Sequence, residues 1–196
     1  IAPSVATEDF GWRGVNKSSE QFTIISAGRF VPLKGFDLTI RSFARFLTTL
    51  DEAEREKCEL LLIGSGPEEG FLQSLVQELN VSQNVKFIAW IERDQLMAKF
   101  KDAATFLFPS HEGAGMVVAE ALSFGLPVIC LDNEGPGQFI HEKCGFAVPH
   151  GTYTETVEGL ANAIDELFHS PEKKAEMSMA ARAEFVRRFH WDRRGE

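Results

Sequence analysis

Two glutamates eight positions apart, Glu112 and Glu120, are the side chains best suited to binding a polar ligand. They lie in PSHEGAGMVVAEA, where Gly113 and Gly115 let backbone N–H groups approach a ligand before an apolar helical segment begins. A carboxylate on such a helix is costly unless it is paired or faces a ligand, and carboxylates accept hydrogen bonds from vicinal hydroxyls such as those of ribose. The spacing predicts a hydroxyl-binding site, with two exposed glutamates as the alternative.

Two cations, Arg29 and Lys34, flank a second turn in the segment GRFVPLKG, just before a predicted helix. The N-terminus of a helix favours anions, and Arg and Lys add charge and hydrogen-bond donors for phosphate oxygens. The segment lacks the GxxxxGK[ST] pattern of a P-loop. It predicts an anion site, with two solvated loop cations as the alternative.

A third turn, Gly64-Ser65-Gly66-Pro67, matches half of the GxGxxG dinucleotide pattern and lacks its third glycine. It fits a ligand-binding loop or a tight strand-to-helix turn. His111 could contact a phosphate or a sugar, or simply lie in a loop, and the other four histidines show no metal-binding spacing.

Short apolar runs alternate with segments of helical period, which is typical of parallel α/β architecture. Strands are predicted at 22–27, 59–63, 85–89, 105–108, 128–131 and 145–148, and helices at 36–50, 68–79, 93–101, 116–124, 154–168 and 171–189. The pattern predicts a Rossmann-like, doubly wound parallel sheet of about six strands. Because ligands of such sheets bind at the carboxyl ends of the strands, the turns described above should meet at one edge.

The composition limits the class of protein. The chain has 196 residues, 44% of them hydrophobic, with Lys+Arg 20 against Asp+Glu 29 and a net charge of −9. These values describe a folded protein of one large or two small domains, and the acidic charge argues against nonspecific binding of nucleic acid. A basic C-terminal group indicates either a solvated helix face or contact with a further domain or anionic lipid: Arg182, Arg187, Arg188, Arg193 and Arg194.

The three cysteines, Cys58, Cys130 and Cys144, cannot all pair within the chain and show no CxxC spacing. Reduced, buried thiols of a cytosolic protein are predicted, with a nucleophile or a metal ligand as alternatives. No apolar run approaches the roughly 18 residues of a membrane helix, and the first residues lack the regions of a signal peptide. Residues 1–20 are expected to form an N-terminal arm or an interdomain segment, and residues 21–196 one domain.

The stretch PSHEGAGMVVAEALSFGLPVI resembles the E-x7-E region of retaining glycosyltransferases of the GT-B fold, family 4 type, also called glycosyl transferases group 1. The matching residues are Pro109, Ser110, Glu112, Gly113, Gly115, Glu120, Ala121, Gly125, Pro127 and Val128. Three further segments resemble the family in the same order: Gly28-Arg29 with Lys34-Gly35, then Ile63-Gly64-Ser65-Gly66-Pro67, then Asn84-Val85-Lys86-Phe87. The resemblance covers about residues 22 to 192.

The resemblance implies roles for several of these residues. Arg29 and Lys34 would bind the donor diphosphate and stabilise it as a leaving group, Glu112 would contact the transferred sugar, and Glu120 would bind the ribose hydroxyls. The amides from Gly113 to Met116 would hold sugar and phosphate, and the backbone at Trp90 and Ile91 would receive the base. The implied donor-binding set is Gly28, Gly64, Gly66, Trp90, Ile91, Gly113, Ala114, Gly115, Met116 and Glu120.

The resemblance also implies partners and location. The substrate would be a nucleotide diphosphate sugar, with no cofactor and no metal, and nucleic acid is not expected as a partner. This chain would be the C-terminal half of a GT-B fold, inactive alone, with Ile1 marking a cut near the boundary with an N-terminal acceptor domain. A cytoplasmic location is expected, with peripheral contact at the inner face of a membrane as a further expectation.

The sequence departs from the family pattern at three places. Ala114 stands where Phe is usual, Ala89-Trp90 where Leu-Gly or Phe-Gly is common, and Gln138 where Glu is frequent. These departures leave the donor open. The alternatives are another GT-B enzyme, such as a nucleotide-sugar epimerase or a phosphorylase with pyridoxal phosphate, and a noncatalytic Rossmann-like module or dehydrogenase domain.

Overall fold

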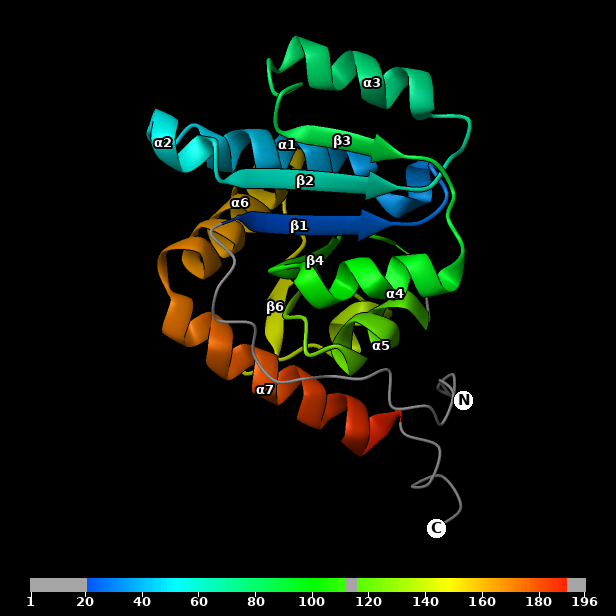
Figure 1. Cartoon of the computed structure of the whole chain (residues 1–196), viewed down its shortest axis with the longest axis vertical. Coiled ribbons are helices and arrows are strands. Elements are labelled where there is room, and N and C mark those ends of the chain that lie inside the picture. The colour runs from blue at the N-terminus through cyan, green and yellow to red at the C-terminus, as the bar shows by residue number, and fades with distance from the viewer. Residues whose placement is uncertain (1–20, 112–115, 190–196) are drawn as a thin grey trace.

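A six-stranded parallel sheet forms the centre of the protein in the computed structural model, which describes residues 21–111 and 116–189 (Figure 1). The strands are β1 (Phe22–Ala27), β2 (Cys58–Ile63), β3 (Val85–Ile88), β4 (Thr105–Phe108), β5 (Val128–Leu131) and β6 (Gly145–Val148). They lie in the order β3-β2-β1-β4-β5-β6, and every neighbouring pair is parallel. The predicted doubly wound sheet is confirmed.

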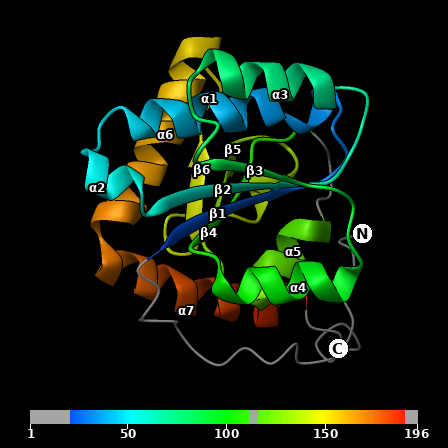
Figure 2. The ribbon, with the colours of Figure 1, turned by 45° about the horizontal axis from the view of Figure 1, so that its top comes forward.

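Helices cover both faces of this sheet (Figure 2). The helices are α1 (Phe36–Leu47), α2 (Glu52–Arg55), α3 (Glu69–Glu78), α4 (Arg93–Asp102), α5 (Met116–Ser123), α6 (Tyr153–His169) and α7 (Pro171–Arg188), with 3-10 turns η1 (Pro32–Lys34) and η2 (Pro136–Gln138). One core cluster joins α1, α3 and α6 to one face, and a second joins α4, α5 and most of the buried part of α7 to the other.

The strands read as continuous apolar runs because both faces are buried. Ile24 and Ile25 of β1 are both fully buried, yet they belong to opposite core clusters. The same alternation separates Leu60 from Leu61 in β2, which pair in register with those two residues. The period of two therefore assigns each side chain to one of the two helical layers.

One predicted element is wrong in its last turn. The expected helix 36–50 ends at Leu47, and α2 begins separately after Asp51. The Asp51 carboxylate accepts the Glu54 backbone N–H at 2.9 Å, and the Glu54 carboxylate accepts the Asp51 N–H at 3.1 Å. This reciprocal capping box satisfies two donors at the start of a new helix, so the chain turns there.

The buried thiols fit the predicted structural role. Cys58, Cys130 and Cys144 are all buried and free. Burial raises the pKa of Cys58 and of Cys130 to about 12, and it raises that of Cys144 as well. Because the thiolate is the reactive form, none of these thiols is activated as a nucleophile.

The C-terminal arginines within the described residues make contacts inside the domain. Arg187 and Arg188 both pair with Glu184, and Arg182 donates to the Ser123 carbonyl oxygen at 2.7 Å. Arg193 and Arg194 lie outside the described residues. In the described ranges, no helix is long and apolar enough to cross a membrane.

Candidate functional site

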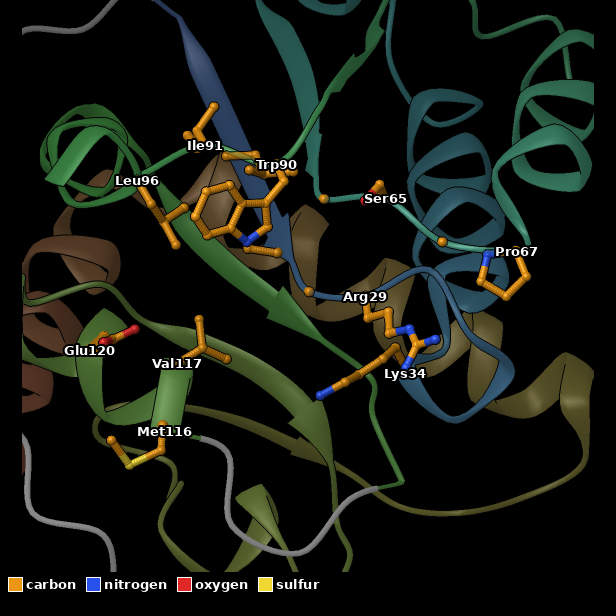
Figure 3. A pocket seen from close by; sticks show the side chains of 15 residues that line it. Arg29, Lys34, Ser65, Pro67, Trp90, Ile91, Leu96, Met116, Val117 and Glu120 are labelled. Atoms are coloured by element: carbon orange, nitrogen blue, oxygen red, sulfur yellow. The ribbon is translucent and has the colours of Figure 1, made fainter. Parts of the chain in front are cut away.

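A pocket of about 750 Å³ opens at the carboxyl ends of β1, β2 and β3, where α4 and α5 face the loops of the sheet (Figure 3). It lies beside the point where the strand order reverses, between β1 and β4, which is where ligands of open α/β sheets bind. It brings together these predicted residues: Gly28, Arg29, Lys34, Gly64, Gly66, Trp90, Ile91, Met116 and Glu120. The predicted residues Glu112, Gly113, Ala114 and Gly115 lie outside the described residues.

One end of the pocket carries the two cations, which a single 3-10 turn separates. Lys34 closes this turn through its backbone N–H, which donates to the Val31 carbonyl at 3.0 Å. Its stem passes over Gly28, and its Nζ lies 5.2 Å from the centroid of the buried Phe108 ring. Arg29 is exposed and extends beside it (Figure 3). The turn thus directs two positive charges to one place, as an anion site requires.

The glycines of the third turn pack backbone against backbone. Gly64 has φ +146°, and a Cβ there would lie 1.9 Å from the Gly28 carbonyl oxygen. The Phe30 N–H donates to the Ser65 carbonyl oxygen at 2.9 Å, which ties the loops after β1 and β2 together. The turn is therefore a tight structural turn that also lines the pocket, and its role as a ligand-binding loop stays a prediction.

The opposite end of the pocket carries a carboxylate. Glu120 lies one turn into α5, and its side chain is only 13% exposed. Its Oε1 accepts a hydrogen bond from Nε of Arg93, the first residue of α4, at 2.9 Å. The carboxylate is thus both paired and at the pocket, which are the two conditions that make a charge on an apolar helix tolerable. Sequence reasoning missed Arg93, because periodicity alone does not show that α4 and α5 meet.

Between these ends lies an aromatic wall. Trp90 follows β3 and is 69% exposed although it is a large apolar side chain. Its indole lies across the pocket from Val117, beside Ile91 and Leu96 (Figure 3). An exposed ring at a pocket is suited to stacking on a flat ligand group.

Two buried or half-buried polar residues, to which the sequence analysis assigned no role, hold three loops together. Ser110 is fully buried, and its hydroxyl donates to the Leu33 carbonyl oxygen at 3.2 Å. The Asn133 amide, from the loop after β5, donates to the Ser110 carbonyl oxygen at 2.8 Å. His111 adds a backbone bond to the same Leu33 carbonyl at 2.9 Å. The end of β4 is therefore fixed against the cation-bearing turn η1.

His111 does not line the pocket. Its ring is exposed, and its centroid lies 5.0 Å from that of His150. Among the residues with described positions, no three His, Cys, Asp or Glu side chains gather as a metal-binding group. The pocket thus offers cations, a carboxylate and an aromatic face, a set that fits an elongated anion with hydroxyl groups and a flat ring.

Sequence comparison gives relatives with named activities. The family described as Glycosyl transferases group 1 matches residues 11–184. The chain is 31% identical, over 86% of its length, to a GDP-mannose-dependent monoacylated alpha-(1-6)-phosphatidylinositol monomannoside mannosyltransferase of Corynebacterium glutamicum. It is 28% identical, over 88% of its length, to the alpha-1,3/1,6-mannosyltransferase ALG2 of Mus musculus. The chain spans 43% of each of these proteins, which is less than half their length.

Structural comparison supports the same fold. The pneumococcal O-GlcNAc transferase GtfA, solved with UDP and GlcNAc, matches 92% of this chain with a TM-score of 0.80 at 19% identity; the match covers 35% of that protein. Anabaena HepE, solved with UDP, matches 87% of this chain with a TM-score of 0.73 at 23% identity and is covered to 45%. The architecture corresponds to the C-terminal half of GT-B structures. Because the family match covers most of its length, the chain belongs to the glycosyl transferases group 1 family, whose members are retaining glycosyltransferases of the GT-B fold.

Proposed function

We propose that this chain is the donor-binding half of a retaining glycosyltransferase, which transfers a sugar from a nucleotide diphosphate sugar to a glycan or lipid-linked glycan. One observation carries the proposal: in a chain of this family, a single pocket holds two cations at one end and a nearly buried carboxylate at the other. A nucleoside diphosphate has a matching arrangement, because its diphosphate and its ribose hydroxyls lie at separate positions along the molecule.

Arg29 and Lys34 act on the diphosphate. The bond to the sugar breaks toward the diphosphate, so negative charge grows on the leaving oxygen, and fixed cations stabilise that charge. The stem of Lys34 is held over Gly28 and beside Phe108, which limits its motion before the ligand arrives. Glu120 accepts the ribose hydroxyls, and the backbone at Trp90 and Ile91 receives the base. Glu112, which lies outside the described residues, contacts the transferred sugar.

Other parts of the function belong to the rest of a longer protein. Residues 21–196 form the nucleotide-sugar domain and residues 1–20 an arm toward an N-terminal acceptor domain, so this chain alone has little or no transfer activity. The names of relatives mention GDP-mannose, and solved neighbours contain UDP, so both bases are candidates here. The name of a relative that acts on a phosphatidylinositol mannoside supports peripheral contact with a membrane, and a cytoplasmic location is part of the proposal.

A binding screen tests the proposal. Isothermal titration of the chain with UDP, GDP, ADP and NAD should show binding of at least one nucleoside diphosphate and weaker binding of NAD. The reverse result, in which NAD binds and no nucleoside diphosphate does, would favour a dinucleotide module and end the proposal. The inactivity of this half is tested separately: robust sugar transfer by the 196-residue chain without a second domain would contradict it.

A further inference from the structure

We propose that Arg93 is a positioning residue for ribose recognition: by holding Oε1 of Glu120, it turns Oε2 toward the sugar hydroxyls of the donor. The inference rests on the proposed function and assigns a role to a residue outside the matched motifs. Arg93 does not line the pocket, whereas Glu120 does. It therefore acts through Glu120 and does not touch the reacting atoms.

The two partners of this ion pair lie in different surroundings. The Glu120 side chain is 13% exposed and that of Arg93 is 47% exposed, with Nε 2.9 Å from Oε1. A carboxylate that has lost most of its water is stabilised by a charged hydrogen-bond donor. The other neighbours of Glu120 on α5, from Val117 to Ala121, are apolar and supply none. Arg93 provides this donor while keeping part of its own hydration.

A second arginine–glutamate pair in the molecule is an ordinary surface salt bridge and serves as a comparison for the Arg93–Glu120 pair. Arg45 of α1 donates through Nε to Glu158 of α6 at 2.7 Å, but both side chains are well exposed, at 48% and 42%. Exposed pairs of this kind contribute little to stability. The arginines are equally exposed in both pairs, so the burial of Glu120 at the pocket is what distinguishes the Arg93 pair.

The bond leaves one carboxylate oxygen for a ligand. Within the described part of the chain, Oε1 accepts the Arg93 Nε–H, and no other hydrogen bond to the Glu120 carboxylate is observed. A carboxylate fixed by one oxygen cannot rotate freely, so Oε2 keeps a defined direction. Figure 3 shows the Glu120 carboxylate extending from α5 into the side of the pocket where Leu96 and Trp90 lie. Preorganisation of this kind reduces the entropy lost when the hydroxyls bind.

Arg93 also links two parts of the site. It begins α4, three residues after Trp90, so the segment that forms the aromatic wall also holds the carboxylate. A shift of this segment would move the wall and Oε2 together. The geometry therefore couples the wall proposed to meet the base with the group proposed to read the ribose.

The experiment compares ribose with its deoxygenated form. Affinities of UDP and GDP, each with its 2′,3′-dideoxy counterpart, are measured for the unmodified chain and for Arg93→Gln, Arg93→Lys, Glu120→Gln and Arg45→Gln. We expect Arg93→Gln to weaken the ribonucleotide about tenfold and to change the dideoxynucleotide less than about twofold. Arg93→Lys keeps the charge without the Nε geometry, so it should restore part of the loss. Arg45→Gln should change neither affinity.

The outcomes separate this inference from the proposed function. Equal losses of affinity for both nucleotides in Arg93→Gln would overturn the positioning role, because a residue that only stabilises the fold affects both ligands alike. An unchanged affinity for the ribonucleotide would overturn it as well. If Glu120→Gln removes the preference for ribose and Arg93→Gln keeps it, only the role of Arg93 is lost. If Glu120→Gln also keeps the preference, the ribose assignment in the proposed function fails. Urea unfolding of each variant confirms that it is folded.

Discussion

The two ends of the pocket are built by different means. At the cation end, backbone atoms set the shape: Gly64 lies against the Gly28 carbonyl, and Gly35, at φ +65°, would place a Cβ 2.3 Å from the Pro109 carbonyl oxygen. At the acidic end, side chains set the shape, through the bond between Arg93 and Glu120. A backbone contact tolerates no added atom, whereas a side-chain contact can be exchanged for another.

The contrast suggests which features of the ligand are fixed and which can vary. A diphosphate presents the same oxygens whatever the nucleotide, so a rigid binding site shaped by backbone atoms is suited to it. The base differs among donors, and the wall proposed to meet it carries the exposed ring of Trp90. We therefore expect the aromatic wall at Trp90, rather than the carboxylate proposed to bind the ribose, to determine which base is accepted.

The largest effect is expected from adding one methyl group at the cation end. Gly64→Ala places a Cβ against the Gly28 carbonyl and forces an L residue to φ +146°. Strain and overpacking together should lower the free energy of unfolding by about 3–5 kcal/mol. Urea denaturation measures this change.

Gly70→Ala is the matched control for that variant. Gly70 lies in α3, and a Cβ there meets nothing within 4 Å. Alanine is the better helix former, so stability should stay the same or rise by up to about 1 kcal/mol. Equal effects of the two substitutions would mean that the backbone contact at Gly64 does not constrain the loop.

The next effect concerns charge at the same end. Lys34→Met removes the ammonium and keeps the stem that packs over Gly28. We expect the affinity for a nucleoside diphosphate to fall about 10- to 100-fold, with little change in the free energy of unfolding, as titration calorimetry and urea unfolding would show. Lys86→Met serves as control, because Lys86 is 63% exposed and pairs with Glu59 away from the pocket. Similar losses in both variants would indicate a nonspecific charge effect.

Much of this arrangement could be predicted from sequence. Six strands and both helical layers follow from short continuous apolar runs and from apolar positions of period 3.6, because burial on both sheet faces leaves a strong pattern. The cations and Glu120 could be selected because ligands bind beside the carboxyl ends of strands, and because a charge on an apolar helix is costly unless it is paired or faces a ligand. The strands at 22–27, 105–108, 128–131 and 145–148 have the predicted bounds.

What could not be predicted depends on contacts between distant segments. Arg93 and Glu120 are 27 positions apart, and no sequence pattern in either segment predicts that their side chains are in contact. Ser110 and Asn133 are 23 positions apart and join two loops by one hydrogen bond. The separate start of α2 was missed for another reason: the Asp51 and Glu54 capping box is a local signal that the longer apolar period obscured.

A smaller effect is expected at the aromatic wall. Trp90→Leu removes a ring that is 69% exposed in the pocket, so the fold should be unchanged. If the indole stacks on the base, the affinity for UDP or GDP falls by about 1 kcal/mol, or about fivefold, while that for inorganic pyrophosphate is unaffected. The change in tryptophan fluorescence caused by the nucleotide should disappear with Trp90.

The control for this variant is Phe71→Leu, an aromatic residue 51% exposed on α3 and outside the pocket. It should alter neither affinity nor fluorescence response. A fluorescence change that persists in Trp90→Leu would show that the nucleotide acts on another tryptophan, and would remove the indole from the base site.

The smallest effect tests a region that is built by side chains but lies away from the pocket. Glu184 of α7 is 5% exposed, and it pairs with Arg187, Arg188 and, at 3.5 Å, with His141. Burial acts to raise the pKa of Glu184, but the hydrogen bonds and charges of the two arginines outweigh it, and the pKa is lowered below its ordinary value of 4.5. A carboxyl whose pKa is lower in the folded state stabilises the fold above its ordinary pKa and loses this contribution as the pH falls.

Glu184→Gln should therefore lower the free energy of unfolding near neutral pH by only about 1 kcal/mol, because the arginines remain partly solvated. The difference from the unmodified chain should shrink once the pH falls below the ordinary value of 4.5, as urea unfolding at a series of pH values would show. Nucleotide affinity should stay the same, since Glu184 does not line the pocket. A difference that is constant with pH would assign the effect to packing rather than charge. A loss of affinity would mean that α7 supports the acidic end, and that side-chain networks across the molecule, not only the Arg93 pair, determine its shape.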